Sequence, residues 1–149
     1  MNVNAAVAKS SNIGVVGVVC RSDRGVFLGA SAVVFQGVTE PATLEACACR
    51  EALALAEDLA VSKARIASDC LRVINDLKSE RNLGEYCMIL REIDDRKTRL
   101  QSCEFVHEHR TSNDEAHRLA RSSSTLCIGR RVWLIDPPDH ICIPLNIIE

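Results

Sequence analysis

Two acidic side chains occupy positions where a carboxylate can either do chemistry or support the fold. Glu45 lies in a run with helical spacing, and Asp69 directly follows a short buried strand predicted at residues 63–68. Taken alone, Glu45 is equally a solvent-facing helix carboxylate. Asp69 is equally a cap for the helix that starts near Leu71, because aspartate is a preferred N-cap residue. The two residues taken singly leave a catalytic and a structural interpretation open.

Histidines offer a second kind of chemistry. His107 and His109 fall on one face of a predicted strand, because side chains two residues apart in a strand point the same way. With His117 they could form a site for a soft metal ion such as zinc. The alternative is a polar rim on an ordinary strand.

The cysteines show no C-x-x-C pair, and several lie among apolar residues. Cys47 and Cys49 stand two apart on a predicted helix, so at about 100° per residue they point to nearly opposite sides and cannot share a metal ion. We therefore expect reduced thiols at all eight positions, Cys20, Cys47, Cys49, Cys70, Cys87, Cys103, Cys127 and Cys142.

The overall composition indicates one packed domain. The chain has 149 residues, of which 47% are hydrophobic and 26% charged. A net charge of -2 argues against a strong hold on nucleic acid through overall charge, so any such binding must use a local patch. Aromatic residues make up only 3%, which disfavours a base-stacking platform. The candidate phosphate contacts are Arg21, Arg24, Arg110, Asn113, Arg118 and Arg121.

Targeting signals are not evident. The N-terminus has no basic region followed by an apolar segment, and no run approaches the roughly 18 apolar residues of a membrane helix. We expect an intracellular protein, and these features do not distinguish the nucleus from the cytoplasm.

The order of the predicted elements mixes antiparallel and parallel strand pairing. Strands at residues 2–7, 13–20 and 26–34 open the chain, the last two joined by the turn signal Ser22-Asp23-Arg24-Gly25. Leu44, Ala48, Ala52, Leu55 and Leu59 recur at helical spacing, and Thr39 is the expected cap of this helix, with Pro41 in its first turn. A strand at 63–68, helices at 70–78 and 86–100, a strand at 102–110 and a helix at 113–121 follow.

The C-terminal part has a different character. Residues 124–149 are apolar, interrupted by prolines, and without a helical period. We expect a domain over residues 1–123 and an extended tail over 124–149 that packs on the domain or on a partner.

Short sequence matches, in this order and spacing, connect these elements to a known family. The chain resembles ribonuclease H type 1 domains, in particular the plant group known as reverse-transcriptase-like. The resemblance implies an α/β, ribonuclease H-like fold with a five-stranded mixed sheet, three antiparallel strands followed by two parallel ones, flanked by helices. The matching segments are Asn2-Val3-Asn4-Ala5-Ala6, Gly17-Val18-Val19-Cys20-Arg21, Glu45-Ala46, Ser68-Asp69-Cys70 and Arg110-Thr111-Ser112-Asn113-Asp114-Glu115-Ala116-His117-Arg118-Leu119-Ala120.

The resemblance also implies a metal-dependent activity. In active members, four carboxylates hold two Mg²⁺ ions that support cleavage of the RNA strand of an RNA/DNA hybrid. Glu45 and Asp69 match two of these carboxylates and would be metal ligands, while Asn4 and His117 stand at the two other catalytic positions. Asn4 keeps an oxygen without the charge, and His117 offers a nitrogen that suits Mn²⁺ better than Mg²⁺.

Two functions follow from these departures. The first is a nucleic-acid-binding ribonuclease H domain, with RNA/DNA hybrid or RNA as its partner, whose Mg²⁺-dependent cleavage is weak or absent. The second is a non-catalytic module that binds nucleic acid or protein. The resemblance supports the first function as that of the family from which the chain descends. Asn4 and His117, which are not carboxylates, favour the second function for the chemistry of this chain.

Overall fold

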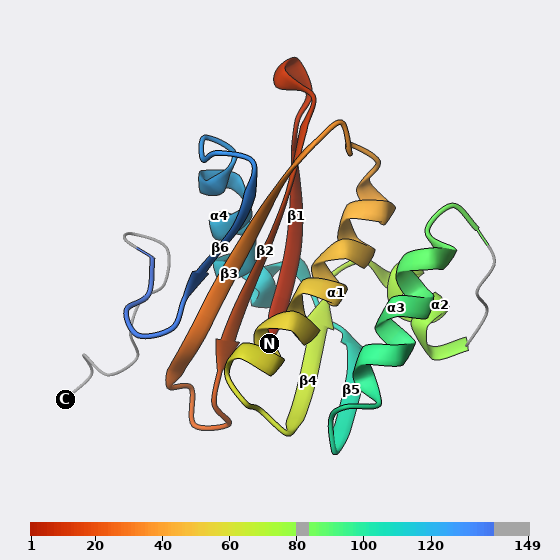
Figure 1. The fold of residues 1–149 in the computed structure, drawn as a ribbon, viewed down its shortest axis with the longest axis vertical. Helices are drawn as coiled ribbons and strands as arrows, with labels where there is room; N and C mark the ends of the chain where they lie inside the picture. Colours follow the sequence, from red (N-terminus) through yellow and green to blue (C-terminus); the bar gives the residue numbers. More distant parts are fainter. Residues whose placement is uncertain (80–83, 139–149) are drawn as a thin grey trace.

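A computed structural model describes residues 1–79 and 84–138 and has a mixed sheet at its centre (Figure 1). The sheet has six strands in the order β5-β4-β1-β2-β3-β6. The strands are β1 (Asn2–Ala8), β2 (Ile13–Arg21), β3 (Phe27–Gln36), β4 (Lys63–Ser68), β5 (Ser102–His107) and β6 (Gly129–Trp133). β1, β2 and β3 pair antiparallel, while β4 and β5 add in parallel on the other side of β1. The mixed α/β fold expected from the sequence is therefore confirmed.

The expected count of five strands was wrong, because β6 pairs antiparallel with the edge of β3. This strand is five residues long and contains two adjacent arginines, so it carries no clean alternation that would have identified it. Residues 129–133 of the expected tail thus belong to the sheet. Residues 139–149 of that tail lie outside the described residues, and the division at residue 123 stays a prediction.

The helix α1 (Pro41–Asp58) packs on one face of the sheet. Leu44, Ala48, Ala52 and Leu55 are buried, as their helical spacing predicted. The helix is capped by Glu40 rather than by the expected Thr39. The carboxylate of Glu40 accepts the N–H of Thr43 at 2.6 Å, because its longer side chain reaches back to the first turn.

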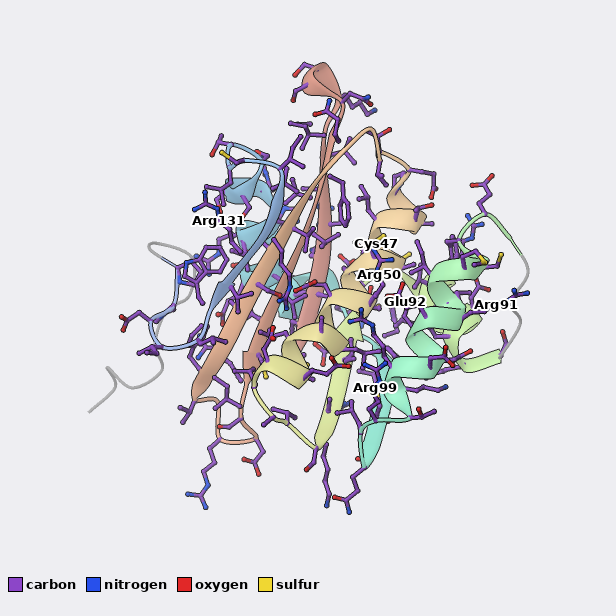
Figure 2. All side chains as sticks on the ribbon, viewed as in Figure 1. Cys47, Arg50, Arg91, Glu92, Arg99 and Arg131 are labelled. Atoms are coloured by element: carbon purple, nitrogen blue, oxygen red, sulfur yellow. The ribbon has the colours of Figure 1, made fainter. Side chains whose placement is uncertain are left out.

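The remaining helices lie on both sides of the sheet. α2 (Leu71–Ser79) and α3 (Cys87–Lys97) lie beside α1, and Arg50 of α1 pairs with Glu92 of α3 at 3.0 Å (Figure 2). The strand expected at 102–110 ends at His107, since residues 110–113 form the short 3₁₀ helix η2 (Arg110–Asn113). The 3₁₀ helix η1 (Lys9–Ser11) joins β1 to β2. Within residues 1–79 and 84–138, no helix combines the length and apolar character needed to cross a bilayer.

The last helix, α4 (Asp114–Ser123), covers the opposite face of the sheet from α1. Gly17 of β2 permits this close packing. A Cβ atom at Gly17 would lie 2.9 Å from the carbonyl oxygen of Ala116 and 2.9 Å from the backbone nitrogen of Ala120. Any larger residue would displace α4 from β1 and β2.

Candidate functional site

The site begins where the ladder between β1 and β4 stops. The two strands pair in parallel at Asn2 and Ala67, and β4 ends at Ser68. Asn4 and Asp69 each lie two residues beyond that pair, Asn4 within β1 and Asp69 directly after the end of β4. β1 continues beyond this point without β4 as a neighbour. Its backbone groups on that side therefore need other partners.

Glu45 reaches into this place from α1. The residue is only 8% exposed, and its Oε1 accepts the backbone N–H of Ala5 at 3.1 Å. Its Oε2 accepts the hydroxyl of Ser68 at 3.1 Å, and the same hydroxyl oxygen accepts the N–H of Cys70 at 3.1 Å. Glu45 thereby connects β1, α1 and the end of β4.

Burial and a like charge together make Glu45 a weak acid. Loss of solvent, and secondarily the nearby negative charge of Asp69, together raise the pKa of its carboxyl from 4.5 to about 7. Hydrogen bonds from Ser68 and from the Ala5 amide oppose this shift by stabilising the ionised form. The negative charge of Asp69 thus acts on Glu45, and the assignment of the two residues as metal ligands stays a prediction.

Asn4 approaches from the other face of the sheet. It pairs with Gly17 across the antiparallel ladder, so its side chain starts on the face that α4 covers. Asn4 is 4% exposed, and its Oδ1 accepts the N–H of Ala5 at 2.7 Å. Its Nδ2 is buried and has no hydrogen-bond partner among the described residues. Asn4 and Glu45 thus share a single donor.

His117 lies half-buried on α4. It follows Ala116, whose carbonyl packs against the position of Gly17 opposite Asn4. Among residues 1–79 and 84–138, no group of three or more His, Cys, Asp or Glu side chains could hold a metal ion. His117 therefore does not complete a ligand set with Glu45 and Asp69.

The side chains at this place do not fit the pair of divalent ions that the resemblance implied. The one oxygen of Asn4 already accepts a hydrogen bond, and its amide nitrogen is a donor that cannot bind a cation. Both oxygens of Glu45 are also engaged by protein donors. Of the four matched positions, only Glu45 and Asp69 supply anionic oxygens, which is fewer than a pair of Mg²⁺ ions requires.

The histidine pair has a structural contact instead of a metal-binding geometry. The rings of His107 and His109 lie edge to face with centroids 6.3 Å apart, and His107 Nε2 is 3.2 Å from the carbonyl oxygen of Asp69. This contact ties the end of β5 to the residue that follows β4. In the described part of the chain, the soft-metal alternative with His117 finds no supporting ligand group.

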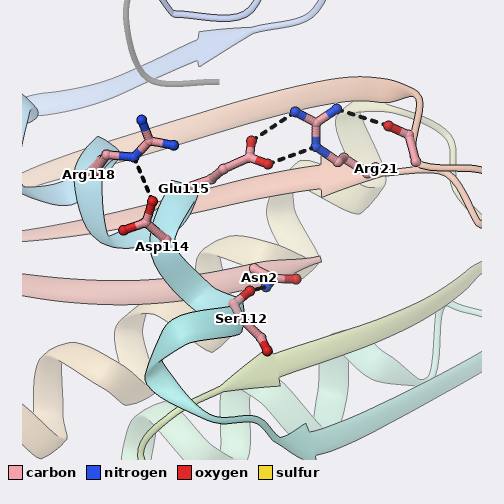
Figure 3. Close-up of polar contacts among 7 residues, drawn as sticks. Asn2, Arg21, Ser112, Asp114, Glu115 and Arg118 are labelled. Atoms are coloured by element: carbon pink, nitrogen blue, oxygen red, sulfur yellow. Dashed lines mark hydrogen bonds and ion pairs between the residues drawn. The ribbon is translucent and has the colours of Figure 1, made fainter. Parts of the chain in front are cut away.

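The expected phosphate contacts differ in how available they are. Arg21 is committed to α4. Its Nε and Nη2 donate to Glu115 at 3.1 and 2.9 Å, and its Nη1 donates to the carbonyl of Gly25 at 2.9 Å (Figure 3). Arg118 pairs with Asp114 at 2.9 Å. Arg24, Arg110 and Arg121 are exposed.

Asn113 was expected to contact nucleic acid, and its position in the structure contradicts that expectation. It is fully buried, and its side-chain amide donates to the carbonyl of Val3. Together with the bond from Asn2 Nδ2 to the carbonyl of Ser112 at 2.7 Å, it holds the start of α4 against β1 (Figure 3). A side chain without solvent access cannot meet a phosphate.

Ser68 is the contributor to this site whose role was not predicted. It is fully buried at the end of β4, where it bonds Glu45. A signal was present in the sequence, because Ser68 continues the two-residue period of the buried positions Ala64 and Ile66. A polar residue at such a core position requires a hydrogen-bond partner.

A separate hollow of about 630 Å³ lies away from the two carboxylates. Its lining includes Asn2, Arg21, Lys63, Arg65 and Glu115, near the start of β1 and of β4. It mixes cationic with anionic side chains and contains none of the four positions matched to the metal site. The chemistry of Glu45 and Asp69 therefore does not extend into it.

The described cysteines carry free thiols. Cys20, Cys47 and Cys49 are buried, and burial raises the pKa of each of these thiols. Cys142 lies outside the described residues.

Comparisons with known proteins agree with this architecture. A family model described as reverse transcriptase-like matches residues 2–123. No curated protein matches the chain. The structure is similar to ribonuclease H1 from the halophilic archaeon Halobacterium salinarum, with a TM-score of 0.74 and 18% identity over 83% of this chain and 93% of that one.

Two further solved structures contain nucleic acid. LC11-RNase H1 in complex with an RNA/DNA hybrid aligns with a TM-score of 0.72 and 17% identity, covering 81% of this chain and 92% of that one. The foamy viral protease-reverse transcriptase, also in complex with an RNA/DNA hybrid, aligns with a TM-score of 0.71 and 17% identity over 85% of this chain and 20% of that one. At these identities the likeness establishes the shared fold.

Proposed function

The chain belongs to the reverse transcriptase-like family, and we propose that it is a nucleic-acid-binding domain whose partner is an RNA/DNA hybrid or RNA. The observation that carries this proposal is the position of Glu45 and Asp69 at the end of the β1–β4 ladder. Two carboxylates that repel each other in a partly buried place are costly to the fold, which favours an origin in function.

We further propose that Mg²⁺-dependent cleavage by this chain is very slow or absent. The support is the loss of two carboxylates at Asn4 and His117 and the engagement of the remaining oxygens around Ala5, where Asn4 and Glu45 accept the same N–H. Mn²⁺ tolerates nitrogen ligands better than Mg²⁺ does, but His117 has no ligand group to join among the described residues. The role left to the domain is binding, carried by its exposed arginines rather than by the two carboxylates.

Arg110 is the arginine best placed to contact a phosphate near the two carboxylates. It is exposed and begins η2, shortly after His107, whose ring contacts the backbone of Asp69. Arg24 lies in the turn beyond Arg21, past the end of β2 that pairs with the start of β1. The two arginines therefore do not form one compact patch with each other.

Binding of a labelled RNA/DNA hybrid, measured by fluorescence anisotropy over a series of salt concentrations, tests the proposal. Arg110→Ala should weaken binding and reduce the slope of log affinity against log salt by about 1, as expected for one lost phosphate contact. Arg131→Ala is the matched control, because Arg131 is an exposed arginine on β6 at the opposite edge of the sheet. Affinity that is absent for the unmodified chain, or equally weakened by both variants, would contradict the proposal.

A further inference from the structure

The side-chain oxygens of Asn4 and Glu45 around the N–H of Ala5 are all engaged in hydrogen bonds. Asn4 Oδ1 and Glu45 Oε1 accept this N–H at 2.7 and 3.1 Å, so one donor serves two acceptors. Glu45 Oε2 is occupied by the hydroxyl of Ser68, which in turn accepts from Cys70. Every oxygen of Asn4 and Glu45 therefore has a donor supplied by the protein.

The identity of residue 4 sets the charge beside this set of hydrogen bonds, because the side chain of Asn4 is neutral. An aspartate at that position would present a second anionic oxygen where Asn4 carries an amide nitrogen. The added negative charge would join those of Glu45 and Asp69 at the end of the β1–β4 ladder and would need a cation to offset the repulsion. The Nδ2 of Asn4 instead has no lone pair for a metal ion, and it is buried without a partner among the described residues.

These hydrogen bonds also join three parts of the chain that are distant in sequence. It links β1 through Ala5, α1 through Glu45 and the end of β4 through Ser68. Glu45 is 8% exposed and Ser68 is fully buried, so these bonds form away from solvent. Hydrogen bonds in such surroundings are costly to leave unmade, which favours a role in holding the fold.

We infer that the hydrogen bonds of Glu45 with Ala5 and Ser68, beside a neutral Asn4, replace the metal pair by a metal-independent tie, so that the domain folds and holds nucleic acid without a divalent ion. The part that concerns folding stands on the contacts above. The part that concerns nucleic acid rests on the proposed function.

Thermal unfolding with a chelator and with Mg²⁺ or Mn²⁺ tests the first part. The unmodified chain should have the same Tm in all three conditions, because no ligand set exists for an ion to bind and stabilise. The variant carrying Asn4→Asp and His117→Asp restores four carboxylate positions and is the positive control. The Tm of this variant in chelator should be several degrees lower than its Tm with either ion.

The variant Asp69→Asn distinguishes ion binding at the candidate site from weak binding of cations elsewhere on the protein surface. A saturable rise in the Tm of the unmodified chain with Mg²⁺ or Mn²⁺, abolished by Asp69→Asn, would overturn the inference. Titration of Mn²⁺ followed by electron paramagnetic resonance gives an independent readout. Loss of the free-ion signal at stoichiometric protein would likewise overturn the inference, whereas an unchanged signal supports it.

Hybrid binding in chelator tests the second part. At constant ionic strength, adding Mg²⁺ should not tighten the affinity of the unmodified chain for the labelled RNA/DNA hybrid. Tightening by Mg²⁺ would overturn the metal-independent binding. If the Tm of the unmodified chain is the same in chelator, Mg²⁺ and Mn²⁺ but no hybrid binds with or without Mg²⁺, the metal-independent tie is supported. The proposed nucleic-acid-binding function is then contradicted.

Discussion

The hydroxyl of Ser68 donates a hydrogen bond to Glu45 at 3.1 Å, and both residues are buried. Ser68 belongs to β4 and Glu45 to α1, so this bond fixes the first helix against the strand that carries Asp69. The same hydroxyl receives the N–H of Cys70 and thereby shapes the chain just after β4. One serine therefore bonds Glu45 directly and holds the backbone that follows Asp69.

Ser68→Ala should lower the free energy of unfolding by about 1 to 3 kcal/mol, because a buried carboxylate oxygen and the Cys70 amide lose their partner. It should also raise the pKa of Glu45 further, since the bond from Ser68 stabilises the ionised form. Urea unfolding measures the stability. Ser79→Ala is the control, because Ser79 is exposed and bonds only the carbonyl of Asp76 within its own helix. Equal stability losses in both variants would contradict this role of Ser68.

Stability should depend on pH through Glu45. Its folded pKa is about 7, above the ordinary 4.5, so the folded state binds the proton more tightly than the unfolded state does. The resulting stabilisation is fully present below about pH 4.5 and is lost as pH rises to about 7. The loss is of the order of 3 kcal/mol, from about 1.4 kcal/mol for each pKa unit.

Glu45→Gln removes the titrating group while it keeps an oxygen for the Ala5 amide. Urea unfolding across this pH range should give a flatter stability profile for the variant than for the unmodified chain. Superimposable profiles would show that Glu45 is not the group responsible.

The pair Arg21 and Glu115 should be coupled more strongly than an ordinary surface pair. Two parallel bonds join the side chains, which are 16% and 32% exposed, and Arg21 also lies 6.0 Å from the ring centre of Phe27. A double-mutant cycle with Arg21→Ala and Glu115→Ala should give a coupling energy of about 1 kcal/mol or more. The more exposed pair Arg118 and Asp114 is the comparison, with an expected coupling of about 0.3 to 0.5 kcal/mol. A smaller value for Arg21 and Glu115 than for this pair would refute the prediction.

Cleavage of a labelled RNA/DNA hybrid should respond to charge at the site. The unmodified chain should be nearly inactive with Mg²⁺. Asn4→Asp together with His117→Asp should restore activity, because a pair of divalent ions is compensated only by the whole carboxylate set. Neither change alone should suffice. Asp69→Asn in the restored background is the control and should abolish the gain.

Two results would contradict this prediction. Robust Mg²⁺-dependent cleavage by the unmodified chain, lost in Asp69→Asn, would mean that two carboxylates are enough. No cleavage by the restored variant, despite an intact circular dichroism spectrum and hybrid binding, would mean that carboxylate charge is not the missing component.

Local pattern in the sequence determined most of the elements. The spacing of Leu44, Ala48, Ala52 and Leu55 predicted α1, and the order of the matching segments predicted the mixed sheet. These features are readable because one face of each helix or strand must be apolar, and that requirement leaves a period in neighbouring residues.

Tertiary structure alone decided which distant groups meet. Nothing near Gly129 in sequence indicates that β6 pairs with β3, and nothing near Asn113 shows that its amide is buried against Val3. The same holds for Ser68 with Glu45 and for Arg21 with Glu115, which are 23 and 94 residues apart. A polar side chain has the same local pattern whether it faces solvent, a phosphate or a buried partner. Only the packed fold, by removing water from some of these groups, requires each to find a particular partner.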